Sequence, residues 1–396
     1  MALEPLLSSS CGTVRKSHTC LLSSKAFAVN ISFRSLSPSA SKSRPFFRRA
    51  VSSSVALIVA ASVSVALPAP ASAASGPMGP RTLGVTAVTL ETSDSVRQAQ
   101  IESIKQSGFP AVRIPIQWPQ VEAVRGVFNW AGTDKLVVDA YNAGLNILAV
   151  PTYTPTWAAI PEGRTFLHPG PADPATYANF TRLAAERYRG LIRNWEIWNE
   201  PNVVHSFAPK PDAAKYSQML KLSYAAIKAV DQYAVIISGG LSPAIDDGTN
   251  ISPARFVEAL YANQAGASLD GIGNHPYSSP DLLSAGTDWW TPRNSIDMIS
   301  YLMYVNGDGW KKIWSTEFGA STTPGQPPYG VTEARQTEIL VDGINYLRSL
   351  PNGGPIFIFD HRDINTGSQN LEENYGLIRT DNSAKPSLAA VRALIN

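Results

Sequence analysis

The run AVRIP at residues 111–115 is followed by DKLVVDAYNA at residues 134–143 and by NILAVP at residues 146–151. The first and last runs are short and apolar, which is typical of buried β-strands. The middle run has the apolar spacing of an amphipathic helix, and Gly144 follows it as a helix end. A strand, a helix and a second strand in this order predict two parallel strands that are joined by a right-handed crossover.

This alternation of strand and helix repeats along the chain. We expect strands at residues 83–88, 111–115, 146–151, 194–198, 234–239, 271–275, 312–316 and 355–359. We expect helices at residues 95–107, 134–143, 174–188, 212–230, 253–263, 292–305, 332–350 and 387–394. Eight strand–helix units fit a closed barrel better than an open sheet, so residues 74–396 are predicted to form a single (β/α)8 TIM barrel of the α/β class.

The first 73 residues have the composition of a targeting segment. Residues 1–47 are rich in serine and basic side chains, an apolar run covers residues 51–67, and Ala71-Ser72-Ala73 matches the A-x-A pattern of a signal-peptide cleavage site. The sequence therefore predicts export to the extracellular space, with no membrane span once the signal is removed. Three alternatives stay open: a start codon placed too far upstream, a bipartite transit peptide that leads to the plastid lumen, and a retained signal that anchors the chain in a membrane.

The composition excludes several classes of protein. With 396 residues, 44% of them hydrophobic and 16% charged, the chain is long and apolar enough for a large core. After residue 73 there are 25 basic and 30 acidic residues and no basic stripe, so we expect no nucleic-acid partner. Both cysteines, Cys11 and Cys20, precede residue 74, so the predicted barrel has no thiol nucleophile and no disulfide. A monomer is the default expectation.

Motifs for other kinds of chemistry are missing from the sequence. It contains neither the G-x-S-x-G elbow of serine hydrolases nor the G-x-x-x-x-G-K-[ST] phosphate loop. The four histidines of the predicted barrel, His168, His205, His275 and His361, are not spaced as metal ligands. We therefore expect no metal and no cofactor.

Polar and aromatic side chains gather at the carboxyl ends of the predicted strands, which form the active face of a (β/α)8 barrel. Aromatic rings stack on the C–H faces of sugars and charged groups bind sugar hydroxyls, so this set predicts a carbohydrate-binding site. The candidates are Arg113, Trp118, Trp157, Asn199, Glu200, His275, Tyr277, Glu317 and His361. Core packing is an equally good interpretation of Trp118, Trp157 and His275. Glu196 is interpreted as a structural or supporting acid.

Glu200 and Glu317 follow the fourth and seventh predicted strands, which lie across the mouth of an eight-stranded barrel from each other. Glycosidic bond cleavage needs a proton for the leaving oxygen and a carboxylate that meets the oxocarbenium-like centre. In retaining enzymes these carboxyl groups stand about 5–5.5 Å apart, which such a mouth allows. Arg113 is expected to hold Glu317 ionised, and Glu200 is expected to need a raised pKa to serve as the acid.

Asn199-Glu200-Pro201 after an aromatic-rich strand, with Thr316-Glu317-Phe318-Gly319 on a late strand, resembles clan A of the retaining glycoside hydrolases. The resemblance covers most of the chain from residue 83 to residue 395. The segments at 112–114, 117–118 and 126–130 resemble the family of β-xylosidases and α-L-iduronidases and the related cellulase-like family. At the end of the eighth strand the clan often has a tryptophan, whereas this chain has Phe359-Asp360-His361.

The resemblance implies a role for each matching residue. Glu200 matches the acid/base and Glu317 the nucleophile. Asn199 matches the contact to the sugar 2-hydroxyl, Arg113 matches the residue that orients the nucleophile, and His275 and Tyr277 match the pair after the sixth strand, in which the tyrosine hydrogen-bonds the nucleophile.

The sequence thus predicts a retaining glycoside hydrolase that cleaves β-linked oligo- or polysaccharide through a covalent glycosyl-enzyme. Two alternatives stay open. One is a catalytically silent barrel that binds glycan, and the other is a transglycosylase that uses the same two carboxylates.

Overall fold

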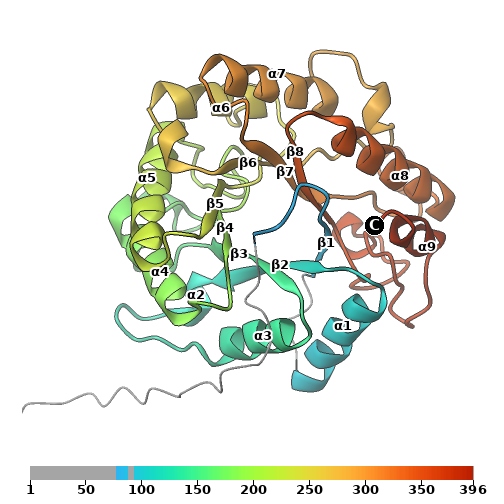
Figure 1. Cartoon of the computed structure of the whole chain (residues 1–396), viewed down its shortest axis with the longest axis horizontal. Coiled ribbons are helices and arrows are strands. Elements are labelled where there is room, and N and C mark those ends of the chain that lie inside the picture. The colour runs from blue at the N-terminus through green and yellow to red at the C-terminus, as the bar shows by residue number, and fades with distance from the viewer. Residues whose placement is uncertain (1–76, 88–92, 396) are drawn as a thin grey trace, which may run out of the picture. The chain divides into compact units, whose positions relative to one another are not determined.

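The computed structural model describes residues 77–87 and 93–395, and in that part of the chain eight parallel strands close into a barrel (Figure 1). Each strand pairs with the next along the chain, and the last pairs with the first, with Leu83 opposite Ile356. The strands are β1 Leu83–Thr86, β2 Ala111–Gln117, β3 Asn146–Thr152, β4 Asn194–Ile197, β5 Val235–Ser238, β6 Gly271–Asn274, β7 Lys312–Phe318 and β8 Gly353–Ile358. The predicted (β/α)8 barrel is confirmed.

The helices form a ring around the strands (Figure 1). They are α1 Asp94–Gln106, α2 Trp118–Val121, α3 Ala131–Asn142, α4 Pro174–Arg187, α5 Ala213–Val230, α6 Pro253–Ala262, α7 Pro292–Val305, α8 Glu333–Ser349 and α9 Pro386–Arg392. Short 3-10 turns are η1 Pro161–Gly163, η2 Gly266–Ser268, η3 Leu283–Ala285 and η4 Leu371–Glu373. Most ends lie within a few residues of the prediction, and the four-residue helix α2 was not predicted.

Two strands that carry site residues run further than the sequence suggested. β2 continues to Gln117 and β7 to Phe318, so Glu317 lies inside its strand instead of after it. The pairing of β7 with β8 also shifts register twice, between Ile313 and Ser315 and again before Phe318. Such irregularities re-aim side chains at the rim of a barrel.

Apolar packing closes the barrel at the end where its strands begin. Met78 lies there in a small buried cluster with Ala111, Leu148, Ile237, Trp314 and Phe357. A much larger apolar cluster fills the layer between the strands and the helices around them. Because both layers consist of buried apolar side chains, the carboxyl ends of the strands are left as the place where polar groups can gather.

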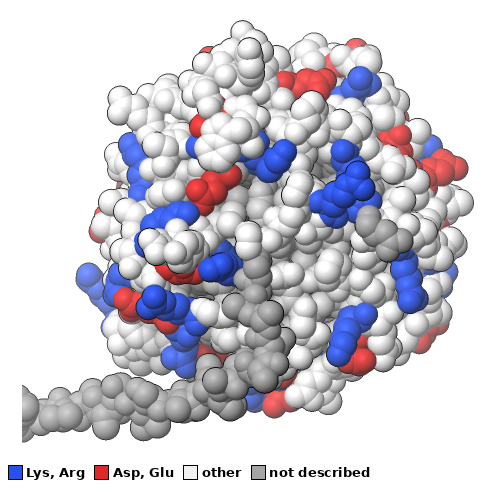
Figure 2. All heavy atoms as spheres, in the orientation of Figure 1, with Lys and Arg blue, Asp and Glu red and all other residues white. Residues whose placement is uncertain are grey.

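The predicted targeting segment, residues 1–73, lies outside the described residues, as does residue 88 at the predicted end of the first strand. Among the described residues, the helices fall short of the length and apolar character needed to cross a bilayer. On the face seen in Figure 2, basic and acidic side chains are interspersed, and neither sign forms a continuous stripe over the described part of that face.

Candidate active site

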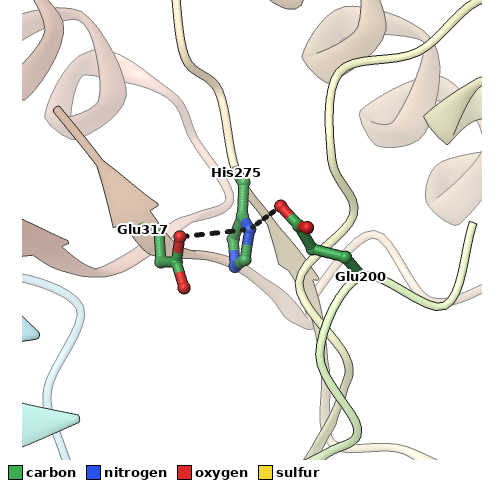
Figure 3. A group of neighbouring side chains, drawn as sticks. All are labelled: Glu200, His275 and Glu317. Carbon is green, nitrogen blue, oxygen red and sulfur yellow. Dashed lines mark hydrogen bonds and ion pairs between the residues drawn. The ribbon is translucent and has the colours of Figure 1, made fainter. Parts of the chain in front are cut away.

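Three side chains meet at the carboxyl ends of three different strands (Figure 3). Glu200 follows β4, His275 follows β6, and Glu317 is the second-last residue of β7. The His275 Nδ1 atom lies 3.0 Å from Glu200 Oε1 and 3.6 Å from Glu317 Oε2. One oxygen of each carboxylate and a nitrogen of the imidazole all lie within 4.8 Å of one another. The two glutamates predicted as a pair are therefore brought together.

Glu317 is held by two hydrogen bonds, both of which were predicted. Arg113 Nη1 donates to Glu317 Oε1 at 2.6 Å, and the Tyr277 hydroxyl donates to Oε2 at 2.7 Å. Burial, together with the negative charge of Glu317, raises the pKa of Tyr277 well above its ordinary value. Tyr277 therefore stays protonated and acts as a donor across the pH range of ordinary enzymes.

Arg113 is buried and connects three acceptors at the centre of the site. Besides Glu317 it binds Glu196 on β4, with Nε 2.7 Å from Oε2 and Nη2 3.1 Å from Oε1. The same Nη2 donates to Asn199 Oδ1 at 2.7 Å. Burial opposes the charge of Arg113, but the carboxylates of Glu196 and Glu317 raise its pKa above the ordinary value. The interpretation of Glu196 as a supporting acid agrees with these contacts.

Asn199 is oriented from both ends of its amide. Its oxygen accepts from Arg113, and its Nδ2 donates to the Tyr153 hydroxyl at 3.0 Å. The ring of Tyr153 stacks on His168 with the ring centroids 3.7 Å apart. The amide of Asn199 is therefore fixed in orientation next to Arg113, which also holds Glu317.

Glu200 has a histidine on each of its carboxylate oxygens. His275 lies next to Oε1, while His205 Nε2 is 2.9 Å from Oε2 and Ser206 Oγ donates to Oε2 at 3.2 Å. Burial would raise the pKa of Glu200, but the hydrogen bonds from His205 and His275 outweigh it and lower the pKa well below its usual range. The raised pKa that the sequence led us to expect for Glu200 is therefore wrong for this arrangement.

The proton positions around His275 follow from its neighbour Thr316. The Thr316 hydroxyl donates to Glu196 Oε1 at 3.0 Å, so its oxygen accepts from His275 Nε2 at 3.0 Å. Because Nε2 then carries a proton, a single further proton is shared between Nδ1 and Glu200 Oε1.

The backbone after β4 is shaped around this cluster. Trp198 and Glu200 have φ values of 73° and 50°, in the left-handed region that side chains rarely adopt. The Glu200 N–H donates to the Gly240 carbonyl at 3.0 Å. A Cβ atom at Gly240 would lie 2.1 Å from His275 Nε2, so only glycine leaves room for the imidazole.

Three predicted residues are not part of the cluster. Trp118 is fully buried, stacks on Phe180 with the ring centroids 5.3 Å apart and donates from Nε1 to Glu122 Oε2 at 2.7 Å. Trp157 is half-buried, and its Nε1 donates to the Glu122 carbonyl. Of the two interpretations left open for the tryptophans, packing is the one that matches the position of Trp118.

His361 is the third predicted residue outside the cluster. It is buried, its ring meets Phe109 edge-on with the centroids 6.3 Å apart, and its Nε2 lies 3.5 Å from Ser107 Oγ. Burial lowers its pKa to about 4, so it is neutral near pH 7. Phe359, two residues earlier, contacts the rings of Tyr277 and Tyr375 beside the nucleophile position.

Sequence reasoning missed His205, Ser206 and Thr316 as members of the site. Thr316 was placed in a strand, where strict alternation turns it away from the face of Glu317. His205 and Ser206 lie in the β4–α5 loop, five and six residues after Glu200. Their closeness to Glu200 in the sequence could have marked them as candidates. Sequence spacing does not show, however, whether a loop turns back toward the residue that precedes it.

No family model matches the sequence, and no curated protein matches it. Solved structures do resemble the fold. A family 39 glycoside hydrolase from Bacteroides cellulosilyticus WH2 has a TM-score of 0.62 at 24% identity, with 80% of this chain and 64% of that chain covered. A monomeric β-xylosidase from Caulobacter crescentus CB15 has a TM-score of 0.59 at 18% identity, with 81% of this chain and 69% of that chain covered.

A third similar structure is a GH5_18 protein from Streptomyces cattleya in complex with GlcNAc. Its TM-score is 0.57 at 16% identity, and the match covers 82% of this chain and 80% of that chain. These neighbours are clan A glycoside hydrolases, in agreement with the resemblance seen in the sequence. At such identities the likeness is one of fold, so the chain has the barrel architecture of clan A glycoside hydrolases.

Proposed function

We propose that this chain is a retaining glycosidase that cleaves β-linked oligo- or polysaccharide through a covalent glycosyl-enzyme. The observation that carries the proposal is the approach of Glu200 and Glu317 to within 4.8 Å, measured between one oxygen of each. Carboxyl groups stand about 5–5.5 Å apart in retaining enzymes and about 6.5–9.5 Å apart in inverting ones, which need room for a water molecule.

Glu317 is the nucleophile in this proposal. The hydrogen bonds from Arg113 and Tyr277 fix the orientation of its carboxylate toward the anomeric carbon. As Glu317 attacks, the glycosidic C–O bond breaks and Glu200 gives a proton to the leaving oxygen. The amide N–H of Asn199 is placed to donate to the 2-hydroxyl of the sugar, a contact that strengthens in the transition state.

Glu200 acts as a base in the second step. It takes a proton from a water molecule, whose oxygen attacks the anomeric carbon and releases Glu317 from the sugar. Two inversions give net retention of the β configuration. Phe359, Tyr277 and Tyr375 form an aromatic group next to Glu317, where a sugar face can pack.

The test is product analysis on a panel of β-linked oligosaccharides, with β-xylo-oligosaccharides first because one structural neighbour is a β-xylosidase. We expect the β anomer as the first product in proton NMR spectra of early time points. Glu317→Ala should lose turnover while its circular dichroism is unchanged. The matched control is Glu338→Ala, since the Glu338 side chain is 61% exposed on α8. An α anomer as the first product contradicts the mechanism, and sugar binding without product favours the silent barrel.

A further inference from the structure

Two histidines share the Glu200 carboxylate, and they differ in surroundings. The His275 side chain is fully buried behind Glu200, whereas the His205 side chain is 66% exposed in the β4–α5 loop. His275 sits beside Oε1, the oxygen nearer Glu317, and His205 sits beside Oε2. One oxygen of Glu200 is thus directed toward the nucleophile and the other toward an imidazole that is open to solvent.

We propose that His205 is a positioning residue that stores a proton for Glu200, so that the acid of this site is a Glu200–His205 pair. This inference rests on the proposed function. Over the two steps of the reaction, His205 gives up one proton and receives one back. During bond cleavage the proton on His205 Nε2 passes to the Glu200 carboxylate, which leaves His205 neutral, and Glu200 gives that proton to the leaving oxygen and becomes a carboxylate again. In the second step Glu200 takes a proton from water and returns it to His205.

With both histidines hydrogen-bonded to it, Glu200 does not hold the proton itself, so the acid is described by the pair. A catalytic acid works best when its pKa lies near the working pH, and hydrogen bonds from two histidines lower the pKa of Glu200 well below that range. The hydrogen bond to Glu200 raises the pKa of His205 above its ordinary 6.5. Near neutral pH the proton is therefore present in the pair, but it is held on the imidazole.

The pair is surrounded by other charged and titratable groups, and two carboxylates among them also favour a proton on His205. Glu317 from β7 and Glu372 from η4 add negative charge that raises the pKa of His205. His168 approaches from the β3–α4 loop, with its Nδ1 3.1 Å from the His205 carbonyl oxygen, and burial lowers the pKa of His168, which makes it neutral near pH 7. His275, Tyr153, Tyr277 and Tyr375 also interact with Glu200, and burial raises the pKa of each of these three tyrosines above its ordinary value.

Ser206 provides a matched control for His205. Its hydroxyl donates to the same Glu200 oxygen at 3.2 Å, but it holds no proton that titrates near neutral pH. His205→Gln removes the stored proton and keeps an amide donor in the loop, while Ser206→Ala removes a donor and keeps the stored proton. Only the first change should alter the proton supply.

The experiment measures kcat/KM against pH for the full chain and for both variants, on an unactivated disaccharide and on an aryl glycoside with a good leaving group. For the disaccharide we expect His205→Gln to move the fall in activity at high pH downward by about one unit, which is about a tenfold loss near pH 7. Ser206→Ala should not move this high-pH fall downward, because loss of a neutral hydrogen-bond donor can only raise the proton affinity of Glu200. The aryl glycoside should show neither effect, because its leaving group needs little protonation.

If the fall in activity at high pH stays in place or moves upward in His205→Gln, the proposal is overturned. A histidine that only donated a hydrogen bond would be replaced by the glutamine amide, or its loss would raise the pKa of Glu200. A second readout does not depend on turnover. In NMR titrations of 15N-labelled histidine, the pKa of His205 should lie above its ordinary value in the unchanged chain and should fall in Glu200→Gln. If the pKa of His205 is not raised, the proposed proton sharing with Glu200 is wrong. If the pKa of His205 is raised but the chain cleaves no sugar, the proton sharing is supported and the proposed function is contradicted.

Discussion

A single buried cation, Arg113, links the two strands that carry the acids of the site. Its guanidinium donates to Glu196 and Asn199 on the side of β4 and to Glu317 on β7. The planar fork of arginine suits several oxygen acceptors at once, which a lysine ammonium cannot match. The site therefore depends on this residue both for charge balance and for the direction of its nucleophile.

We expect Arg113→Met to lower the free energy of unfolding by about 3–5 kcal/mol, because two buried carboxylates lose their counter-charge. Activity should fall with it, since Glu317 would lose its main partner. Urea denaturation and kcat/KM measure the two effects. Arg182→Met is the control, since Arg182 pairs with Glu186 on the exposed face of α4 and such pairs contribute less than about 1 kcal/mol. Equal stability of the two variants would contradict the expectation.

At the scale of elements, the ends of β4, β5 and β6 are fitted to one another around Gly240. This glycine follows β5, accepts from the Glu200 N–H and leaves room for the His275 imidazole. Its N–H also donates to Glu196 Oε1 at 2.8 Å. Three neighbouring strand ends therefore share one position that has no side chain.

Gly240→Ala should destabilise the chain by about 1–3 kcal/mol, the usual cost of overpacking, and should displace His275 from Glu200. A crystal structure of the variant or the NMR titration of His275 detects the displacement. Gly132→Ala is the control, because an added Cβ there meets no atom within 4 Å and α3 gains a better helix former. An intact His275–Glu200 contact in Gly240→Ala would contradict this expectation, because it would mean that the backbone of the strand ends moves enough to make room for the added Cβ.

The order of the elements could be predicted from the sequence because each strand and helix leaves its own local pattern. Arg113, Glu200 and Glu317 could also be predicted, since residues at strand ends of a parallel barrel must converge on one rim. His205 could not, because a loop is directed by its tertiary contacts. Neither could the partners of Thr316, because the register shifts of β7 change which side chains face inward.

On the scale of the whole molecule, the glutamate–histidine cluster couples folding to pH. The lowered pKa of Glu200 gives stability that is present above the ordinary value of 4.5 and is lost as the pH falls below it. Contacts with Glu200 and Glu317 raise the pKa of His275 in spite of burial, so its contribution is present below the ordinary 6.5 and is lost as the pH rises through the raised value.

The stability difference between the unchanged chain and Glu200→Gln should therefore be largest between about pH 4.5 and 6.5 and should shrink on both sides. Denaturant titrations at a series of pH values measure it. Glu338→Gln, on the exposed face of α8, serves as the control and should show a flat difference over the same range. A flat difference for Glu200→Gln would mean that its two histidines do not interact with it in solution.

The buried cluster around Met78 has a practical consequence. It brings the chain into the barrel at the end where the strands begin, while Glu200 and Glu317 lie where the strands finish. A carrier protein, an affinity handle or a solid support joined just ahead of Pro77 is therefore attached on the side away from the carboxylates. Immobilised in this way, the barrel would face a solution of polymer with its reactive rim uncovered.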